Sequence, residues 1–311
     1  MKCKIEKSKL NGEVTCPANK SYTHRGVFLA ALSDGKSIIK KILRSNDTKA
    51  TIDACNAFGV NVDESDDTIT VTNTIGSTVQ GSMINAQNSG TTIRIATAIA
   101  ALSGGNTELT GDESLKQRPM RPILNSLEEL GVSTESNDGK PPIRIRGKIK
   151  GDHVVIKGDI SSQFITALLI ISPRLENGLV IEIDGNVVSK PYIDLTITTM
   201  NKFGVSVKVI ESYKKYSIEH QIYKPTTFTV PSDFSNLALL LAANVLLGDS
   251  LKIKINLGEL PQGDEEIVDI LEKLGVSVIL DGDTITTKSP ELLDGGKFDL
   301  SDTPDLLPEL A

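Results

Sequence analysis

The stretch NAFGVNV at residues 56–62 decides the fold, because three related stretches follow it: EELGVST at 128–134, NKFGVSV at 201–207 and EKLGVSV at 272–278. Their glycines recur at intervals of about 72 residues, which indicates a structural repeat. Apolar residues at helical spacing precede the glycine, and alternating β-branched residues follow it. We therefore expect each stretch to contain a helix end, a glycine in the left-handed conformation and the start of a strand.

Two further elements recur with these stretches. Hairpin signals follow them, as in DESDDTITVT at 63–72 and LDGDTITTK at 280–288. Between them lie runs of small and apolar residues that end near a glycine and continue into strand-like sequence, at 24–40, 92–110, 163–183 and 235–255. Helices that are apolar nearly all round belong in the interior. The expected unit is strand, helix, strand, helix, strand, strand, and the expected fold class is α/β.

The repeats also predict the domain organisation. Four units are present in full, and FDLSDTPDLLPELA at 298–311 resembles the beginning of a fifth. With three units to a domain, residues 18–228 form one complete domain, and residues 1–17 with 229–311 form a discontinuous second one. Because a repeat needs its neighbours to bury its apolar face, we expect a C-terminally truncated chain. The alternative is a frayed surface helix at a natural terminus.

Composition restricts the kind of protein. The 311 residues carry a net charge of −7, which argues against general nucleic-acid binding, so any anion site must be local. No apolar run is long enough for a membrane span or a signal peptide, and we expect a cytoplasmic protein. Cys3, Cys16 and Cys55 show no metal-binding or disulfide spacing and are expected to be reduced thiols.

Positive charge and small hydroxyl residues gather just before the apolar helices, where helix N-termini favour anions. The segments are PANKSYTHR at 17–25, QNSGTTIR at 87–94, KQRPMRP at 116–122, DISSQF at 159–164 and SKPYID at 189–194. Each alone is more typical of a helix cap than of a ligand site. Their recurrence at equivalent positions of successive repeats favours one shared pocket for a polyanion.

These segments resemble the motifs of the 5-enolpyruvylshikimate-3-phosphate synthase family, in its order and spacing, over residues 17–311. SSQFITALLI followed by VSKPYIDLT is the most specific part. The resemblance implies a two-domain inside-out α/β barrel with the site in a cleft. The implied reaction belongs to aromatic amino-acid biosynthesis, in the shikimate pathway: it transfers the enolpyruvyl group of phosphoenolpyruvate to the 5-hydroxyl of shikimate 3-phosphate and releases phosphate. It implies no metal or other cofactor, and we expect a monomer.

The resemblance also implies roles for individual residues. Lys20 faces both substrates, while Ser21 and Arg25 bind the shikimate carboxylate. Asp305 contacts shikimate hydroxyls and is the candidate base, so Lys20 and Asp305 are the catalytic candidates. The implied cradle for shikimate 3-phosphate consists of Ser161, Ser162, Gln163, Ser189 and Tyr192. The implied surroundings of phosphoenolpyruvate are Asn88, Gly90, Thr91, Arg94 and Arg118.

The sequence departs from the family pattern in three respects. Ala18 and Asn19 replace the usual Gly-Ser before the lysine, Ile95 replaces the common proline after Arg94, and the later phosphoenolpyruvate-binding segments do not occur before Ala311. The alternatives are a non-catalytic ligand-binding remnant and a UDP-N-acetylglucosamine enolpyruvyl transferase. The second is disfavoured because residues 112–122 lack its loop cysteine.

Two interpretations concern residues outside these motifs. His24 is expected to be a packing or capping residue rather than a catalytic one. The acidic run 264–266 is expected to be a solvated helix start that complements the helix dipole.

Overall fold

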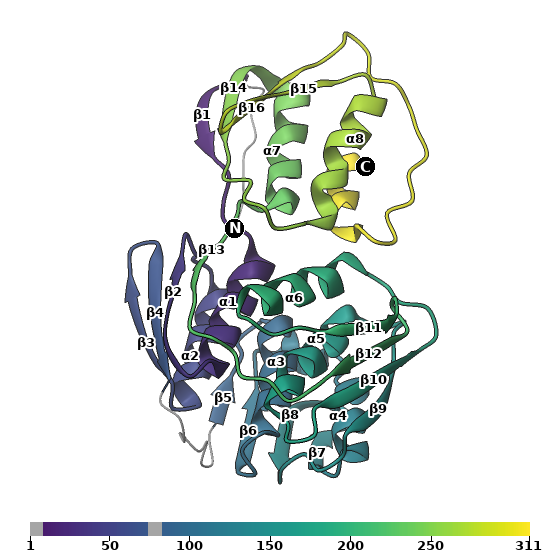
Figure 1. Cartoon of the computed structure of the whole chain (residues 1–311). Coiled ribbons are helices and arrows are strands. Elements are labelled where there is room, and N and C mark those ends of the chain that lie inside the picture. The colour runs from purple at the N-terminus through teal and green to yellow at the C-terminus, as the bar shows by residue number, and fades with distance from the viewer. Residues whose placement is uncertain (1–8, 74–82) are drawn as a thin grey trace. The chain divides into compact units, whose positions relative to one another are not determined.

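The computed structural model describes residues 9–73 and 83–311, so Cys3 lies outside the described residues. The chain divides into two compact units, Met1–Asn19 with Pro231–Ala311 and Lys20–Val230. Both units contain helices and sheets (Figure 1). None of the described helices combines the length and apolar character that a bilayer span requires.

The larger unit consists of three repeats of one pattern, each with a four-stranded sheet and two helices. In every sheet the first two strands are parallel and the remaining pairs are antiparallel, with the orders β13-β2-β4-β3, β5-β6-β8-β7 and β9-β10-β12-β11. This pattern confirms the predicted βαβαββ unit. The elements of the first repeat are β13 (Thr227–Thr229), α1 (Lys20–Leu32), β2 (Gly35–Lys40), α2 (Asn46–Ala57), β3 (Asn61–Ser65) and β4 (Thr68–Asn73).

The second and third repeats follow the same order, each with one short 3-10 helix added. Those of the second are β5 (Met83–Asn85), α3 (Gly90–Ala100), β6 (Asn106–Thr110), η1 (Leu115–Gln117), α4 (Arg121–Glu129), β7 (Ser133–Asn137) and β8 (Lys140–Arg146). Those of the third are β9 (His153–Lys157), α5 (Ser162–Ile171), η2 (Ser172–Arg174), β10 (Leu179–Asp184), α6 (Pro191–Lys202), β11 (Lys208–Glu211) and β12 (Lys215–Ile218).

The first helix of each repeat in the larger unit is almost completely buried. Nearly every residue of α1, α3 and α5 is inaccessible to solvent, as the all-round apolar sequence predicts. Helix α3 packs on α5, α5 on α6, and α1 on both α2 and α6. Figure 1 shows α1, α3 and α5 inside the unit and the sheets around them. The starts of α3 and α5 lie close together, because Oε1 of Gln163 is 3.8 Å from a Cβ placed at Gly90.

The repeated glycines have the predicted conformation. Gly59, Gly131, Gly204 and Gly275 have φ values of 81°, 89°, 79° and 88°. Each directly follows the residue that caps the C-terminus of a second helix: α2, α4, α6 or α8 (Glu266–Lys273). Because a side chain in this left-handed region costs about 1–2 kcal/mol, the glycine is the favoured residue at each helix end.

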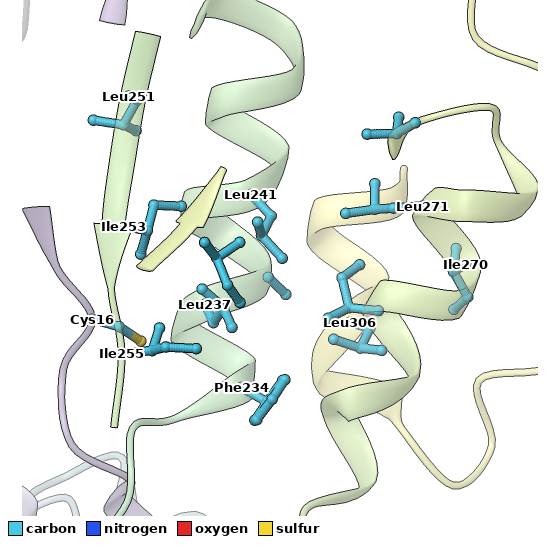
Figure 2. Close-up of a cluster of buried hydrophobic side chains, with 14 residues drawn as sticks. Cys16, Phe234, Leu237, Leu241, Leu251, Ile253, Ile255, Ile270, Leu271 and Leu306 are labelled. Carbon is cyan, nitrogen blue, oxygen red and sulfur yellow. The ribbon is translucent and has the colours of Figure 1, made fainter. Parts of the chain in front are cut away.

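The smaller unit contains a fourth sheet, of order β1-β14-β16-β15, and two main helices. Its apolar core joins Leu237 and Leu241 of α7 to Ile253 of β14 and Leu271 of α8 (Figure 2). Leu306 is fully buried in this core, whereas Leu307 is 58% exposed, so the final segment buries only part of its apolar surface. The elements are β1 (Leu10–Thr15), α7 (Phe234–Leu247), β14 (Gly248–Lys254), η3 (Gly263–Glu265), α8, β15 (Ser277–Asp281), β16 (Thr284–Lys288), η4 (Pro304–Leu306) and α9 (Leu307–Leu310).

The first strands of two repeats are exchanged along the chain. Strand β1 precedes α1 in sequence but pairs in parallel with β14 of the smaller unit. Strand β13 precedes α7 but pairs in parallel with β2 of the larger unit. Each unit thus depends on a strand from a distant part of the chain.

Candidate active site

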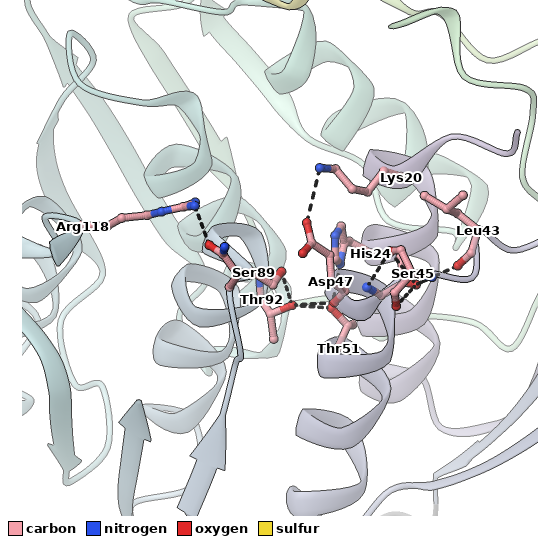
Figure 3. Close-up of polar contacts among 11 residues, drawn as sticks. Lys20, His24, Leu43, Ser45, Asp47, Thr51, Ser89, Thr92 and Arg118 are labelled. Carbon is pink, nitrogen blue, oxygen red and sulfur yellow. Dashed lines mark hydrogen bonds and ion pairs between the residues drawn. The ribbon is translucent and has the colours of Figure 1, made fainter. Parts of the chain in front are cut away.

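The site begins at the first turn of α1. Lys20 is the first residue of this helix, and its Nζ lies 3.3 Å from Oδ2 of Asp47 on α2 (Figure 3). Both side chains are partly exposed. The pair connects the lysine predicted to face the substrates with a carboxylate that the sequence analysis did not identify.

Arg25 lies one turn further along α1 and is only 2% exposed. Its Nε donates to Oγ1 of Thr196 at 2.8 Å, and its Nη2 donates to Oγ1 of Thr166 at 3.2 Å and to the Tyr192 carbonyl at 3.3 Å. Its Nη1 donates to the carbonyl of Ser21 at 3.1 Å. Each of these acceptors within the described residues is an uncharged oxygen.

A guanidinium has five N–H groups, so one on Nη1 has no acceptor among the described residues and is available to a ligand. Burial lowers the pKa of Arg25 to about 10, so the group is still a cation at neutral pH. A buried cation bonded only to neutral oxygens is expected to attract an anionic group.

A second positive centre surrounds the start of α3. The Nη1 of Arg94 donates to Oε1 of Gln163, and its guanidinium lies 4.7 Å from the ring centroid of Phe164. The Nη2 of Arg118 donates to Oδ1 of Asn88 at 2.7 Å. Burial, followed by the positive charge of Arg118, lowers the pKa of Arg94 to about 10.

Gly90 explains how the two guanidinium groups come so close to the helix. A Cβ at this position would lie 2.8 Å from Nη1 of Arg118 and 3.6 Å from Nη1 of Arg94. The bare backbone therefore leaves the space that the Arg118 guanidinium occupies, whereas the distance to Arg94 is an ordinary van der Waals contact. The Nε of Arg94 is buried without a hydrogen-bond partner among the described residues, so this centre has an unused donor.

The starts of α5 and α6 complete this part of the larger unit. Ser161 caps α5, its Oγ accepting a bond from the backbone N–H of Gln163 at 3.3 Å, and Ser162 is buried. Ser189 has a positive φ of 54° just before α6, and Tyr192 in the first turn of α6 presents its carbonyl to Arg25.

The structure thus brings most of the predicted site residues together in two contact groups of the larger unit. One contains Ser21, Arg25 and Tyr192, and the other contains Asn88, Gly90, Arg94, Arg118 and Gln163. Lys20 contacts Asp47 instead. Thr91 lies half-buried in the first turn of α3.

Asp305, the candidate base, belongs to the smaller unit. It is exposed in η4, and its catalytic role stays a prediction. Nearby Asp264 is buried, which corrects the expectation that residues 264–266 are all solvated. Burial, together with the charges of Asp305, Asp233 and Glu309, raises the pKa of Asp264 to about 6, against a hydrogen bond from Ser235 that lowers it. The sequence run is acidic, but only the fold reveals which member points inward.

The sequence did not indicate the residues that form hydrogen bonds and ion pairs with Arg25 and Lys20. Thr166 and Thr196 bind Arg25, and Asp47 binds Lys20. Thr166 and Thr196 do lie within or directly after the motifs SSQFITALLI and SKPYID, and this proximity is the signal that could have indicated them. His24 is buried, in agreement with the expected packing role.

Fold and site together define a class of protein: an α/β protein of repeated βαβαββ units that presents buried arginines at adjacent helix starts. The model of the family EPSP synthase (3-phosphoshikimate 1-carboxyvinyltransferase) matches residues 5–311. The chain therefore belongs to the EPSP synthase family.

Individual relatives agree with this assignment. The chain is 55% identical to a 3-phosphoshikimate 1-carboxyvinyltransferase of Nitrosopumilus maritimus, with all of this chain and 74% of the relative covered. It is 40% identical to the protein of that name from Methanocorpusculum labreanum, also with 74% of the relative covered.

Solved structures support the fold. The EPSP synthase from Acinetobacter baumannii superposes with a TM-score of 0.77 at 21% identity, over 97% of this chain and 71% of that one. The enolpyruvyl transferase NikO from Streptomyces tendae superposes with a TM-score of 0.69 at 17% identity, over 97% and 72%. The predicted enolpyruvyl transferase fold is thereby confirmed.

Proposed function

We infer that this protein is a 3-phosphoshikimate 1-carboxyvinyltransferase of aromatic amino-acid biosynthesis. It transfers the enolpyruvyl group of phosphoenolpyruvate to the 5-hydroxyl of shikimate 3-phosphate and releases phosphate. Among the structural observations, the strongest support is the set of three arginines, Arg25, Arg94 and Arg118, for which no carboxylate partner is found in the described residues. Two substrates that each carry a phosphate and a carboxylate supply the missing negative charge.

Arg25 is proposed to bind the carboxylate of shikimate 3-phosphate. Its side chain is fixed at three nitrogen atoms by neutral acceptors, which leaves one N–H for the ligand. A charge-assisted bond from a rigid, buried donor is strong and directional. Ser21 lies on the same helix turn, while Ser161, Ser162, Gln163, Ser189 and Tyr192 are proposed to surround the phosphate and ring.

Arg94 and Arg118 are proposed to bind phosphoenolpyruvate. Nη1 of Arg94 and Nη1 of Arg118 both lie within 4 Å of the Cβ position of Gly90, at the N-terminus of α3, and Nε of Arg94 has no hydrogen-bond partner among the described residues. Asn88 holds Arg118, and Thr91 continues the same turn. Two neighbouring cations also favour the negative charge that develops on the departing phosphate.

The reaction is an addition followed by an elimination. The 5-hydroxyl oxygen bonds to C2 of phosphoenolpyruvate and loses its proton, while C3 gains a proton. In the second step the C2–phosphate bond breaks, C3 loses a proton, and the double bond is restored. Lys20 and Asp305 are the proposed catalytic groups, with Asp305 as the base for the 5-hydroxyl.

We further propose that the enzyme works in the cytoplasm as a monomer and needs no cofactor. A net charge of −7 makes nucleic acids and anionic membrane surfaces unfavourable partners.

A phosphate-release assay with both substrates tests the function. We expect phosphate release only when both substrates are present. In Asp305→Asn the rate of phosphate release should fall about 100-fold or more, which is the usual effect of losing a general base. Asp281→Asn, which alters an exposed carboxylate in the same unit, is the matched control and should retain the wild-type rate. Release that does not depend on shikimate 3-phosphate, or no release with both substrates, would contradict the proposal.

A further inference from the structure

Four polar side chains form a buried chain of hydrogen bonds across three helices of the larger unit. Nδ1 of His24 on α1 lies 2.7 Å from Oγ1 of Thr51 on α2, which lies 2.7 Å from Oγ1 of Thr92 on α3. Thr92 donates to Oγ of Ser89 at 2.7 Å. All four residues are at most 1% exposed, and Figure 3 shows their alignment.

The direction of these bonds follows from counting protons. The Thr92 hydroxyl has one proton, which it gives to Ser89 at 2.7 Å or to the carbonyl of Asp47 at 3.4 Å. Thr51 must therefore donate to Thr92, because Thr92 has no second proton. With its own proton used in this way, Thr51 can only accept from His24. Nδ1 of the imidazole therefore carries a proton, which it donates to Thr51.

The surroundings of the ring agree with this protonation state. Its Nε2 is buried without a hydrogen-bond partner among the described residues. Burial, followed by the nearby charges of Lys20 and Arg25, lowers the pKa of His24 to about 3. A neutral ring is consequently expected at neutral pH.

Both ends of this series of hydrogen bonds, at Ser89 and at His24, lie next to residues of the candidate active site. Ser89 is the N-cap of α3 and directly precedes Gly90, around which Arg94 and Arg118 gather. His24 stands between Ser21 and Arg25 on α1. Thr92 also approaches the backbone of Asp47, whose carboxylate binds Lys20.

Hydrogen bonds restrict the sliding and rotation of these helices more strongly than apolar contacts do. Apolar side chains lose little when one helix slides or rotates slightly against another, whereas a hydrogen bond weakens steeply with angle. Two of the three bonds run between helices, from α1 to α2 and from α2 to α3, and they therefore fix the rotation of α3 relative to α2 and of α2 relative to α1. The third bond, from Thr92 to Ser89, ties the N-cap of α3 to the same set.

We propose that His24, Thr51 and Thr92 are positioning residues. They form an oriented relay that holds the phosphoenolpyruvate-binding start of α3 in register with the lysine and arginine of α1. This inference rests on the proposed function for the identity of the ligand. The relay and its direction do not depend on that function.

Nitrogen NMR of the imidazoles tests the relay directly. The sequence contains only three histidines, so the His24 signals can be assigned by comparison with His153→Gln and His220→Gln. We expect a neutral ring with the proton on Nδ1, although free neutral imidazole side chains prefer it on Nε2. In Thr51→Val, Nδ1 loses its acceptor, and population of the Nε2–H form should increase. A wild-type ring protonated on Nε2, or charged at neutral pH, would overturn the relay.

The positioning role is tested by measuring the affinity for phosphoenolpyruvate by calorimetry, with shikimate 3-phosphate present. Thr51→Val should weaken the affinity about tenfold, the equivalent of one net hydrogen bond, while Thr51→Ser should restore it. Thr97→Val is the matched control, because Thr97 is also buried on α3 but its hydroxyl, among the described residues, bonds only to the Ile93 carbonyl of its own helix. Binding of shikimate 3-phosphate alone should stay within about twofold in all three variants, since Arg25 keeps its partners.

The outcomes separate this inference from the proposed function. Equal losses in Thr51→Val and Thr97→Val, or no rescue by serine, would show that Thr51 has only a packing role. If the wild-type protein binds no phosphoenolpyruvate, the assignment of the ligand fails, whereas the Nδ1–H form would still establish the relay.

Discussion

Replacing Arg25 with methionine should separate binding from stability. The side chain is 2% exposed, and its positive charge is bonded, among the described residues, to neutral oxygens only. Methionine fills a similar volume without the charge. We expect Arg25→Met to fold normally and to lose most of its affinity for shikimate 3-phosphate.

The effect on stability is a difference between two terms. Burial lowers the pKa of Arg25 from 12.5 to about 10, which corresponds to about 3 kcal/mol of unfavourable free energy in the folded state. Both folded and unfolded chains are protonated below pH 10, so this cost applies fully at neutral pH. The substitution removes it, but it also removes four hydrogen bonds worth about 1 kcal/mol each.

The acceptors that remain can still pair with one another. The Oγ1 atoms of Thr166 and Thr196 lie 3.0 Å apart, and Oγ1 of Thr196 donates to the Tyr192 carbonyl at 2.7 Å. The two terms therefore nearly cancel, and the melting temperature should change by less than about 5 °C. Binding has no such compensation. Loss of the single available N–H and of the buried charge should cost about 3 kcal/mol, or about a hundredfold in Kd.

Calorimetry with shikimate 3-phosphate and thermal unfolding without ligand measure both quantities. Arg174→Met is the control, because Arg174 already has an acidic partner, its Nη1 lying 3.4 Å from Oδ2 of Asp34. That variant should lose some stability and keep its affinity. Affinity of Arg25→Met within threefold of wild type would refute the carboxylate assignment. A large fall in its melting temperature would show instead that the arginine is a structural residue.

Two other changes address the remaining charged groups. Gly90→Ala introduces a Cβ 2.8 Å from Nη1 of Arg118. We therefore expect the affinity for phosphoenolpyruvate to fall about tenfold, while shikimate 3-phosphate still binds. Equal losses of affinity for both ligands would contradict the assignment of Arg118 to phosphoenolpyruvate. Asp264 has its pKa raised from 3.8 to about 6, so the folded state gains stability as the pH falls from about 6 towards 4. Asp264→Asn should therefore stabilise the protein against urea by about 3 kcal/mol at pH 8 and by about half of that at pH 5. A gain that is independent of pH would contradict the burial argument.

Much of the fold could be predicted because the same local physics recurs in every repeat. A left-handed glycine at a helix end, followed by β-branched residues and a hairpin, has few alternative structures, and four copies at even spacing make chance agreement improbable. Gly131 and Gly275, far apart in sequence, therefore have nearly the same φ. The repeat count predicted that residues 1–17 belong with 229–311, but the pairing of β1 with β14 and of β13 with β2 is long-range, and no local pattern indicates which strands pair.

The site divides in the same way. Motifs indicated the residues at the helix starts, such as Arg25 and Arg94, because charge and small hydroxyls stand out against apolar helices. They could not indicate which threonines those residues contact. Thr196 and Thr199 each donate to a carbonyl of their own helix, but only Thr196 also accepts from Arg25. Proximity to the SKPYID motif favours Thr196, but the contact itself becomes visible only in the fold. The difference arises from the rotation of α6 against α1.

The larger unit uses the same helices for its core and its site, and these helices hold Arg25 and Arg94, for which the described residues offer no acidic partner. Phe164 is a fully buried core residue of α5, and it is also the ring beneath the Arg94 guanidinium. An exposed loop would let such an arginine turn towards solvent, where its charge is well hydrated. Fixed on a buried helix, the Arg94 guanidinium keeps an Nε donor that has no hydrogen-bond partner among the described residues. Burial of this unsatisfied donor destabilises the fold without ligand, and an anion that pairs with the cation removes part of that cost.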